Sequence, residues 1–382
     1  MAATYVYAII PTGDQVIFEE VSGVDDEQDE VYTIPYHGLA AVVSASPLAD
    51  YRGLKRDEAV RYLVPHQCVV EVVMQRFPAL PVKFGTVLPD ESWVHRLLAQ
   101  GEGLFHTALE KFSGRVQMEV VAFWNLQEVF HEIGQEEHIA QLKAHVAGRP
   151  PEETLIERVA IGQMVHASLE QRRASLRNYL LYSLREVALD LVGNPPMGDS
   201  MVANVALLVD EAGQEALDRQ LRLLDEEFEG RLTFRCVGPL PPYSFATVEV
   251  ERPSFETVDE ARRRLGLGEV VPSAEIRRAY HRLADQMHPD HNPDAPEAEA
   301  RMAELTQAYH LLMAYAENVQ RSGGAEEQGS QGAEEQGSRG AGEVLLRTSA
   351  PPHLCTFRRE VVEQTLLIAI RRQEMLVSQG GA

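Results

Sequence analysis

The first 250 residues alternate between short runs rich in β-branched and aromatic residues and longer stretches in which apolar residues recur at helical spacing. Residues 5–10 and 38–44 predict strands, because such side chains pack well on a pleated surface. Residues 58–76 predict a helix that Pro65 interrupts. The same reasoning predicts strands within 80–90, 117–124, 201–210, 231–237 and 244–250, and helices at 93–112, 127–192 and 214–228.

This mixture of strands and helices predicts two α+β domains, residues 1–115 and residues 116–252, the second with a helical middle. After Pro253 the apolar spacing is helical up to about residue 320. We therefore expect an all-α domain at residues 256–318.

A low-complexity stretch follows the predicted helices. The sequence GAEEQGS occurs at residues 324–330 and again at 332–338, and its residue types cannot bury a core. We therefore expect a flexible acidic linker at 321–342. The segment 356–377 predicts an amphipathic C-terminal helix that folds back on the body of the protein. Its apolar face would consist of Phe357, Leu366, Leu367 and Ile370.

Composition narrows the class of partner. The chain has 382 residues, of which 45% are hydrophobic, and no uninterrupted apolar run approaches the roughly 20 residues that a membrane-spanning helix needs. It carries 35 Lys and Arg against 58 Asp and Glu, a net charge of −23. Because the averaged field repels phosphate backbones and anionic lipids, we expect neither a nucleic acid nor a membrane as a partner.

The cysteines indicate the compartment. Cys68, Cys236 and Cys355 lie far apart and form no CxxC pair, and the N-terminus lacks a basic region followed by an apolar signal sequence. We expect a reduced, cytoplasmic protein.

Two apolar stripes at helical spacing flank a His-Pro-Asp sequence at residues 288–290. Ser273 can cap the first helix, and Pro289 excludes a continuous helix through the turn. Asp294, with Glu297 three residues later, resembles a capping box that starts the second helix. Two antiparallel helices can therefore pack their stripes together and display His-Pro-Asp at the tip. The stripes are Ile276, Tyr280, Leu283 and Met287, then Met302, Leu305, Tyr309 and Leu312.

With Ala-Tyr pairs at 279–280 and 308–309, this segment resembles the J domain of DnaJ-type co-chaperones over about residues 256–318. The resemblance implies that the His-Pro-Asp sequence couples the domain to ATP hydrolysis by a DnaK-type chaperone, and that the basic face of the preceding helix docks on that chaperone. The Gly/Phe-rich stretch and the zinc-binding cysteines of complete DnaJ proteins are absent from the sequence. The chaperone-binding residues implied here are His288, Pro289, Asp290, Arg277, Arg278 and Arg282.

The predicted docking helix departs from the family in its charge. Residues 273–287 carry three arginines against Glu275 and Asp285, so their net charge is only +1. Such a face provides little long-range steering on an acidic chain. His291 also stands where the family usually has a basic residue. A J-like domain that acts as a DnaK-independent interaction module is therefore an alternative hypothesis.

Six stretches of the first 250 residues carry a second resemblance: YVYAIIP, VYTIPYHGLAAVVS, LPVKFGTVLPD, QMEVVAFWN, MVANVALLVD and GPLPPYSF, in this order. They resemble the gas vesicle synthesis proteins of the GvpL/GvpF family. The resemblance implies a non-enzymatic accessory protein for gas vesicle assembly, with two α+β domains of which the N-terminal one is ferredoxin-like. It also implies the hydrophobic shell protein GvpA and other vesicle accessory proteins as partners, and the gas vesicle as location.

Signs of chemistry are weak. No P-loop, GxGxxG, GxSxG or HExxH motif occurs, and we expect neither a cofactor nor a metal. His131, Glu132 and His138 lie on a predicted helix with the imidazoles about two turns apart, which favours a solvated face over a metal site. Lys83 and Arg61 could form an anion site with Tyr243 and Ser244, but a snorkelling or ion-paired lysine is favoured. An enzyme of unknown reaction on the α+β region is the remaining alternative, and it would need perturbed titratable groups gathered in one pocket.

Overall fold

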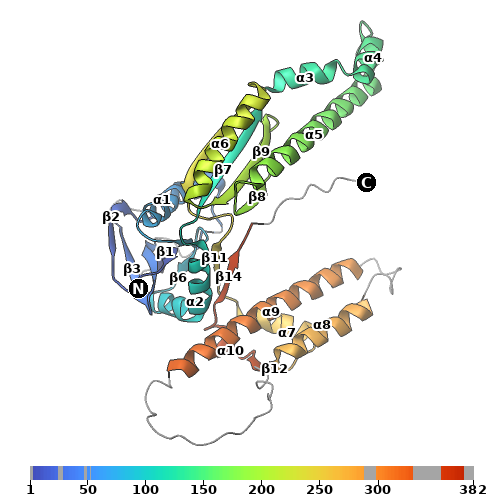
Figure 1. Ribbon diagram of the computed structural model, residues 1–382. Coiled ribbons are helices and arrows are strands. Elements are labelled where there is room, and N and C mark those ends of the chain that lie inside the picture. Colours follow the sequence, from blue (N-terminus) through green and yellow to red (C-terminus); the bar gives the residue numbers. More distant parts are fainter. Residues whose placement is uncertain are drawn as a thin grey trace, which may run out of the picture. The chain divides into compact units, whose positions relative to one another are not determined.

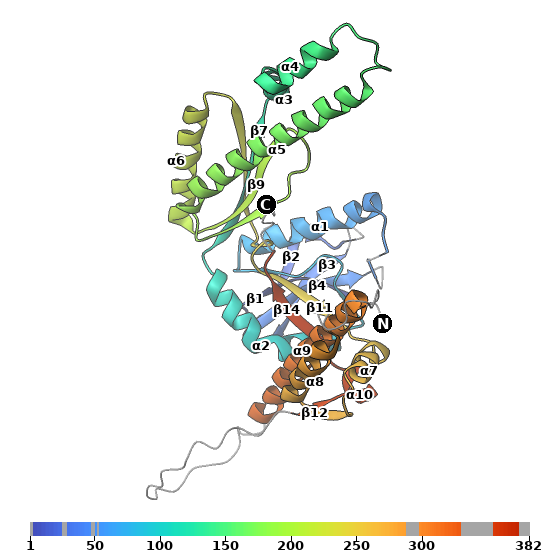
Figure 2. The ribbon, with the colours of Figure 1, turned by 90° about the vertical axis from the view of Figure 1, so that its right-hand side faces the viewer.

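The computed structural model describes residues 3–24, 29–46, 50–51, 53–287, 298–329 and 354–373 (Figures 1 and 2). The chain forms two compact units, each assembled from segments that are distant in the sequence. The first unit consists of Met1–Val73, Val82–Ala108 and Val248–Ile370, and the second of Met74–Pro81, Leu109–Thr247 and Arg371–Ala382.

An antiparallel sheet forms the N-terminal part of the first unit. Its strands lie in the order β2-β3-β4-β1, and β6 also pairs with β1. All of β1 after Ala3 is buried. His37 and Gly38 have positive φ angles, as the two-residue turn between β3 and β4 requires. The bounds are β1 Ala3–Ile10, β2 Ile17–Ser22, β3 Glu30–Tyr36, β4 Leu39–Ser46 and β6 Val87–Leu88.

Two helices accompany this sheet. Helix α1 (Arg56–Met74) buries His66, Val69, Val70 and Val73, and it continues through Pro65 rather than being interrupted there. Helix α2 (Glu91–Phe112) buries an apolar face as well. That face consists of Val94, Leu97, Leu98 and Phe105.

The second unit has the β-α-β-β-α-β order of the ferredoxin-like fold. Its strands lie in the order β10-β7-β9-β8, and all neighbouring strands are antiparallel. The core lies between this sheet and the long helices α5 and α6. The bounds are β7 Val116–Trp124, α3 Leu126–Gly134, α4 Glu137–Val146, α5 Leu155–Arg185, β8 Asp190–Asn194, β9 Met201–Val209, α6 Glu211–Phe228 and β10 Leu232–Leu240. The short strand β5 (Leu80–Pro81) is not part of the ferredoxin-like sheet.

These topologies confirm the α+β class but correct the position of the ferredoxin-like fold. The N-terminal sheet has four strands in succession before its first helix, whereas the ferredoxin-like order lies in the second unit. Strand β2 was not predicted because it buries only Phe18. Strand β8 overlaps the end of the predicted helix 127–192, since a short apolar run has no period that separates strand from helix. The division into separate domains after residues 115 and 252 stays a prediction.

The first unit also contains the helical region that the sequence predicts. Helices α8 and α9 lie side by side in both views (Figures 1 and 2). Ile276, Leu305 and Leu312 of the two predicted stripes are buried between them. Helix α9 runs into the predicted linker, whose residues 330–342 lie outside the described part of the chain. The bounds are β11 Thr247–Glu251, α7 Phe255–Arg264, β12 Val270–Pro272, α8 Ser273–Met287 and α9 Ala298–Gly329.

The predicted amphipathic helix at 356–377 is wrong. Residues 354–371, which we call the C-terminal strap, form β13 (Leu354–Thr356), α10 (Arg359–Val362) and β14 (Leu367–Arg371). Strand β13 pairs with β12, and β14 pairs with β11. Leu366, Leu367 and Ile368 are buried in succession, whereas a helix would bury only every third or fourth residue. The expected docking of this segment is nevertheless confirmed, because Phe357 and Leu366 are buried.

A buried histidine joins α1 to the N-terminal sheet and makes the first unit sensitive to acid. His66 is 2% exposed. The Tyr5 hydroxyl accepts from the Gly85 N–H at 2.9 Å and can therefore donate to His66 Nδ1 at 3.1 Å. The His66 ring also stacks on Tyr7. Burial lowers the pKa of His66 to about 4.

Because the unfolded chain binds the proton more readily, His66 should cost the first unit about 1.4 kcal/mol of stability per pH unit as the pH falls from about 6.5 towards 4. Above that window it should cost nothing. Replacing His66 by Phe should flatten this slope, measured by hydrogen exchange of the β1 amides, whereas His95→Phe on the exposed side of α2 should leave it unchanged. Equal slopes for His66→Phe and the unaltered protein would contradict this assignment.

Candidate functional site

The exposed face of α8 carries the three arginines to which the sequence assigns chaperone docking. Arg277, Arg278 and Arg282 are exposed, and none of them has an ion-pair partner within the part of the chain that the structure describes. They face outwards because Ile276 and Ala279 fill the inner side of the helix. The arginines are therefore available to an acidic partner.

The packing of α8 on α9 fixes the direction in which this face points. The rings of Tyr280 and Tyr309 stack with centroids 4.2 Å apart and planes 18° apart. The Tyr280 and Thr306 hydroxyls lie 3.3 Å apart. Stacked aromatic pairs of this kind stabilise a contact beyond their burial alone.

The His-Pro-Asp sequence, residues 288–290, lies outside the described residues, as do His291 and the predicted capping box at 294–297. Helix α8 ends at Met287, so the tripeptide follows directly on the docking helix. Its display at the tip beside the three arginines stays a prediction from the sequence.

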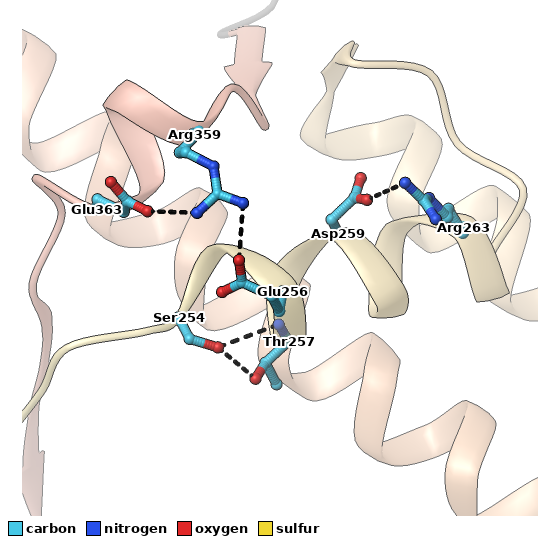
Figure 3. A network of polar contacts seen from close by, with 7 residues as sticks. All are labelled: Ser254, Glu256, Thr257, Asp259, Arg263, Arg359 and Glu363. Carbon is cyan, nitrogen blue, oxygen red and sulfur yellow. Dashed lines mark hydrogen bonds and ion pairs between the residues drawn. The ribbon is translucent and has the colours of Figure 1, made fainter.

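Polar contacts tie α7 to the C-terminal strap (Figure 3). The Ser254 hydroxyl accepts from the Thr257 N–H at 3.1 Å and caps α7. Arg359 donates to Glu256 at 2.7 Å and to Glu363 at 2.8 Å, so one guanidinium joins the start of α7 to α10. Within α7, Asp259 pairs with Arg263 at 2.6 Å.

The strap also completes the core of the helical region. Phe357 is 1% exposed, and its ring lies 5.5 Å from that of Tyr315 on α9. The Tyr315 hydroxyl donates to the Thr356 carbonyl oxygen at 2.6 Å, and burial raises the pKa of Tyr315 to about 12. The signal for this contact in the sequence is an apolar segment that needs a covering surface. Because the apolar spacing predicts a helix there, the strand partners of the segment could not be foreseen.

The second unit contains a cleft of about 470 Å³, in which the active site of an enzyme would be expected. Arg172 on its wall donates to Glu132 at 2.6 Å and to Glu136 at 2.8 Å. A hydrogen bond from Ser168, and then Arg172, hold the pKa of Glu136 below its ordinary value. Glu136 is therefore not poised to donate a proton near neutral pH.

The other weak candidates have ordinary explanations. His131 bonds to Gln135 at 2.8 Å, and Lys83 pairs with Glu249 at 2.8 Å, as favoured for a lone lysine. Among the residues that the structure describes, no group of three or more His, Cys, Asp and Glu could hold a metal ion. No described helix is both long and apolar enough to cross a bilayer.

The α+β region matches one protein family over almost its whole length. The family described as gas vesicle synthesis protein GvpL/GvpF matches residues 3–247. Gas vesicle protein F of Streptomyces sp. (strain CB03234) is 27% identical over 243 residues, which are 64% of this chain and 99% of the relative. Gas vesicle protein L of the same strain is 28% identical over 282 residues, 68% of this chain and 97% of the relative.

A solved structure agrees with these matches. The crystal structure of the gas vesicle protein GvpF from Anabaena sp. PCC7120 has a TM-score of 0.52 and 25% identity, and the match covers 64% of this chain and 98% of that one.

The helical region matches a different family. The DnaJ domain matches residues 263–318. The chaperone protein DnaJ of Oleidesulfovibrio alaskensis (strain ATCC BAA-1058 / DSM 17464 / G20) is 48% identical over 48 residues, which are 13% of this chain and 13% of that protein. The likeness to DnaJ is thus confined to the J domain. The chain belongs to the gas vesicle synthesis protein GvpL/GvpF family, and it carries a DnaJ-type J domain behind its family region.

Proposed function

We propose that this chain is a non-enzymatic accessory protein of gas vesicle assembly. It holds the shell protein GvpA, or another vesicle protein, with its α+β regions, and it recruits a DnaK-type chaperone through its J domain. It acts in the cytoplasm, at the growing vesicle. The observation that carries the proposal is the fusion itself, a GvpL/GvpF family region at 3–247 and a DnaJ domain at 263–318 in one chain.

The physical chemistry of a gas vesicle supports this combination. A wall that excludes water and encloses gas must present an apolar face, so its subunits are prone to aggregate before they assemble. An escort that binds such a subunit and also brings an ATP-driven chaperone keeps the subunit soluble until it is incorporated.

The ferredoxin-like sheet offers a place for such a subunit. Strand β10 is an outer strand of that sheet, and residues 235–239 on it are exposed. An exposed strand edge can accept a further strand from a partner through main-chain hydrogen bonds. We therefore assign β10 as the edge that takes up the vesicle protein.

A charge on β10 should block this strand addition. Val237 is 38% exposed on β10, and Val237→Lys should reduce the amount of GvpA that co-purifies with the chain. Leu223→Lys places the same charge at an exposed apolar position on α6 and should leave co-purification unchanged. Failure of the unaltered protein to retain GvpA or any other vesicle protein would overturn the proposed client, and equal loss in both variants would overturn the role of β10.

The J domain should stimulate ATP hydrolysis by a DnaK-type chaperone, and His288→Gln should abolish that stimulation. The circular dichroism of the variant should stay that of the unaltered protein, because a turn residue contributes little to the core. The rate of ATP hydrolysis at saturating concentration is the measurement. Identical rates with both proteins would instead favour the DnaK-independent interaction module.

Charge on α8 should set the affinity for the chaperone. Reversing Arg277, Arg278 and Arg282 to Glu should weaken binding, and Asp285→Arg should strengthen it, with a modest dependence on salt because few charges take part. Reversing Arg219, Arg222 and Arg231 of the second unit to Glu changes the net charge by the same amount outside the J domain and serves as the control. Titrations at two salt concentrations test this, and an unchanged dissociation constant for the triple variant would show that α8 is not the docking face.

A further inference from the structure

One face of α2 contacts the chain at both the entry to the J domain and the exit from it. Trp93, Arg96 and Gln100 are spaced three and four residues apart and therefore share this face, which we call the α2 clamp. All three are half-buried, whereas the neighbouring Val94 and Leu97 are fully buried in the core.

The segment that leads into the J domain is short and contacts an aromatic ring. Only residues 252–254 connect β11 to α7. The guanidinium carbon of Arg252 lies 4.4 Å from the centroid of the Trp93 ring, and that of Arg96 lies 4.7 Å from the same ring. A guanidinium over the face of a tryptophan is attracted by the ring quadrupole. The connection therefore has a defined course along α2.

The segment that leaves the J domain is held one and two turns further along the same face, at Arg96 and Gln100. Arg96 Nη1 donates to the Gln364 carbonyl oxygen at 3.1 Å. The Leu366 N–H donates to Gln100 Oε1 at 3.1 Å, and the Leu366 side chain is completely buried. The strap thus reaches α2 through its own backbone, beside the point where the chain entered the J domain.

The other side of the strap is bonded to the J domain. The Ile368 N–H donates to Asn318 Oδ1 at 3.0 Å, and Arg321 Nη1 donates to the Ile368 carbonyl oxygen at 3.1 Å. Asn318 is 4% exposed and also donates to the Ala314 carbonyl oxygen at 2.8 Å. The strap therefore bridges α9 and α2, and its main chain bonds to side chains on both helices.

We propose that the α2 clamp and the C-terminal strap together hold the J domain in one orientation on the N-terminal α+β region. As an extension that rests on the proposed function, a chaperone recruited by the J domain is then held at a set distance from the N-terminal sheet. A flexible tether would spread the chaperone and this sheet over a range of separations. Trp93, Arg96 and Gln100 act here as positioning residues.

The fixed orientation can be measured without any partner. Spin labels at Glu19→Cys on β2 and His281→Cys on α8 occupy exposed positions on the two parts, after Cys68 and Cys236 are changed to Ser. The distance distribution should show a single narrow peak. The clamp variant Trp93→Ala/Arg96→Ala/Gln100→Ala should lose this peak and give a broad distribution. Because the clamp lies outside the core of α2, the variant should stay folded.

The matched control is His95→Ala/Glu102→Ala, which alters the opposite side of α2 and should keep the narrow peak. A broad distribution in the unaltered protein, or a narrow one in the clamp variant, would overturn the fixed orientation.

Measurements with the chaperone and GvpA distinguish a failure of the positioning role from a failure of the proposed function. Chaperone ATPase stimulation and GvpA co-purification, each measured alone, should be the same for the clamp variant and the control. The amount of bound chaperone that is cross-linked to a photoreactive group attached at Glu19→Cys on β2 should fall only in the clamp variant. If the unaltered protein neither stimulates nor binds, the proposed function fails while the distance measurement still decides the orientation. Equal cross-linking in both variants would overturn the positioning role.

Discussion

The burial of Phe357 against Tyr315 is the contact on which the arrangement of the J domain depends. It brings the end of the chain into a core that α7, α8 and α9 would otherwise leave open, and β13 then pairs with β12 while Arg359 reaches Glu256. A domain whose core is completed by a distant segment cannot move independently of that segment. The strap then continues to α2 and to β11, so the same burial also joins the J domain to helix α2 of the N-terminal α+β region.

Local patterns predicted the elements of this protein better than its long-range contacts. The strand at 201–210, the helix at 93–112 and the two facing helices of the J domain follow from spacing alone, because one face of each is buried. The strap could not be predicted in the same way. Its strands are two short pieces that form only because β11 and β12 offer edges, and Leu366 to Ile368 are buried on every side. Propensity carries no information about such partners.

The residues of the candidate site also differ in whether the sequence alone could predict their role. The three arginines of α8 could be placed from sequence, since helical spacing opposes them to Ile276 and Ala279. The α2 clamp could not, because Trp93 and Gln100 gain their meaning from Arg252 and Leu366, which lie more than a hundred residues away in the chain. The three arginines are also a local exception on a chain of net charge −23, which confines any electrostatic attraction of an acidic partner to close range.

The central claim is that a chaperone and a vesicle protein are brought together by one chain. The most direct measurement is the soluble fraction of GvpA synthesised in a cell-free system that contains a DnaK-type chaperone and ATP. If one chain brings the two partners together, GvpA should stay soluble when this chain and the chaperone are both present, and it should sediment when either is left out. A soluble fraction that rises equally with the chain alone, or that does not rise with both, would contradict the account.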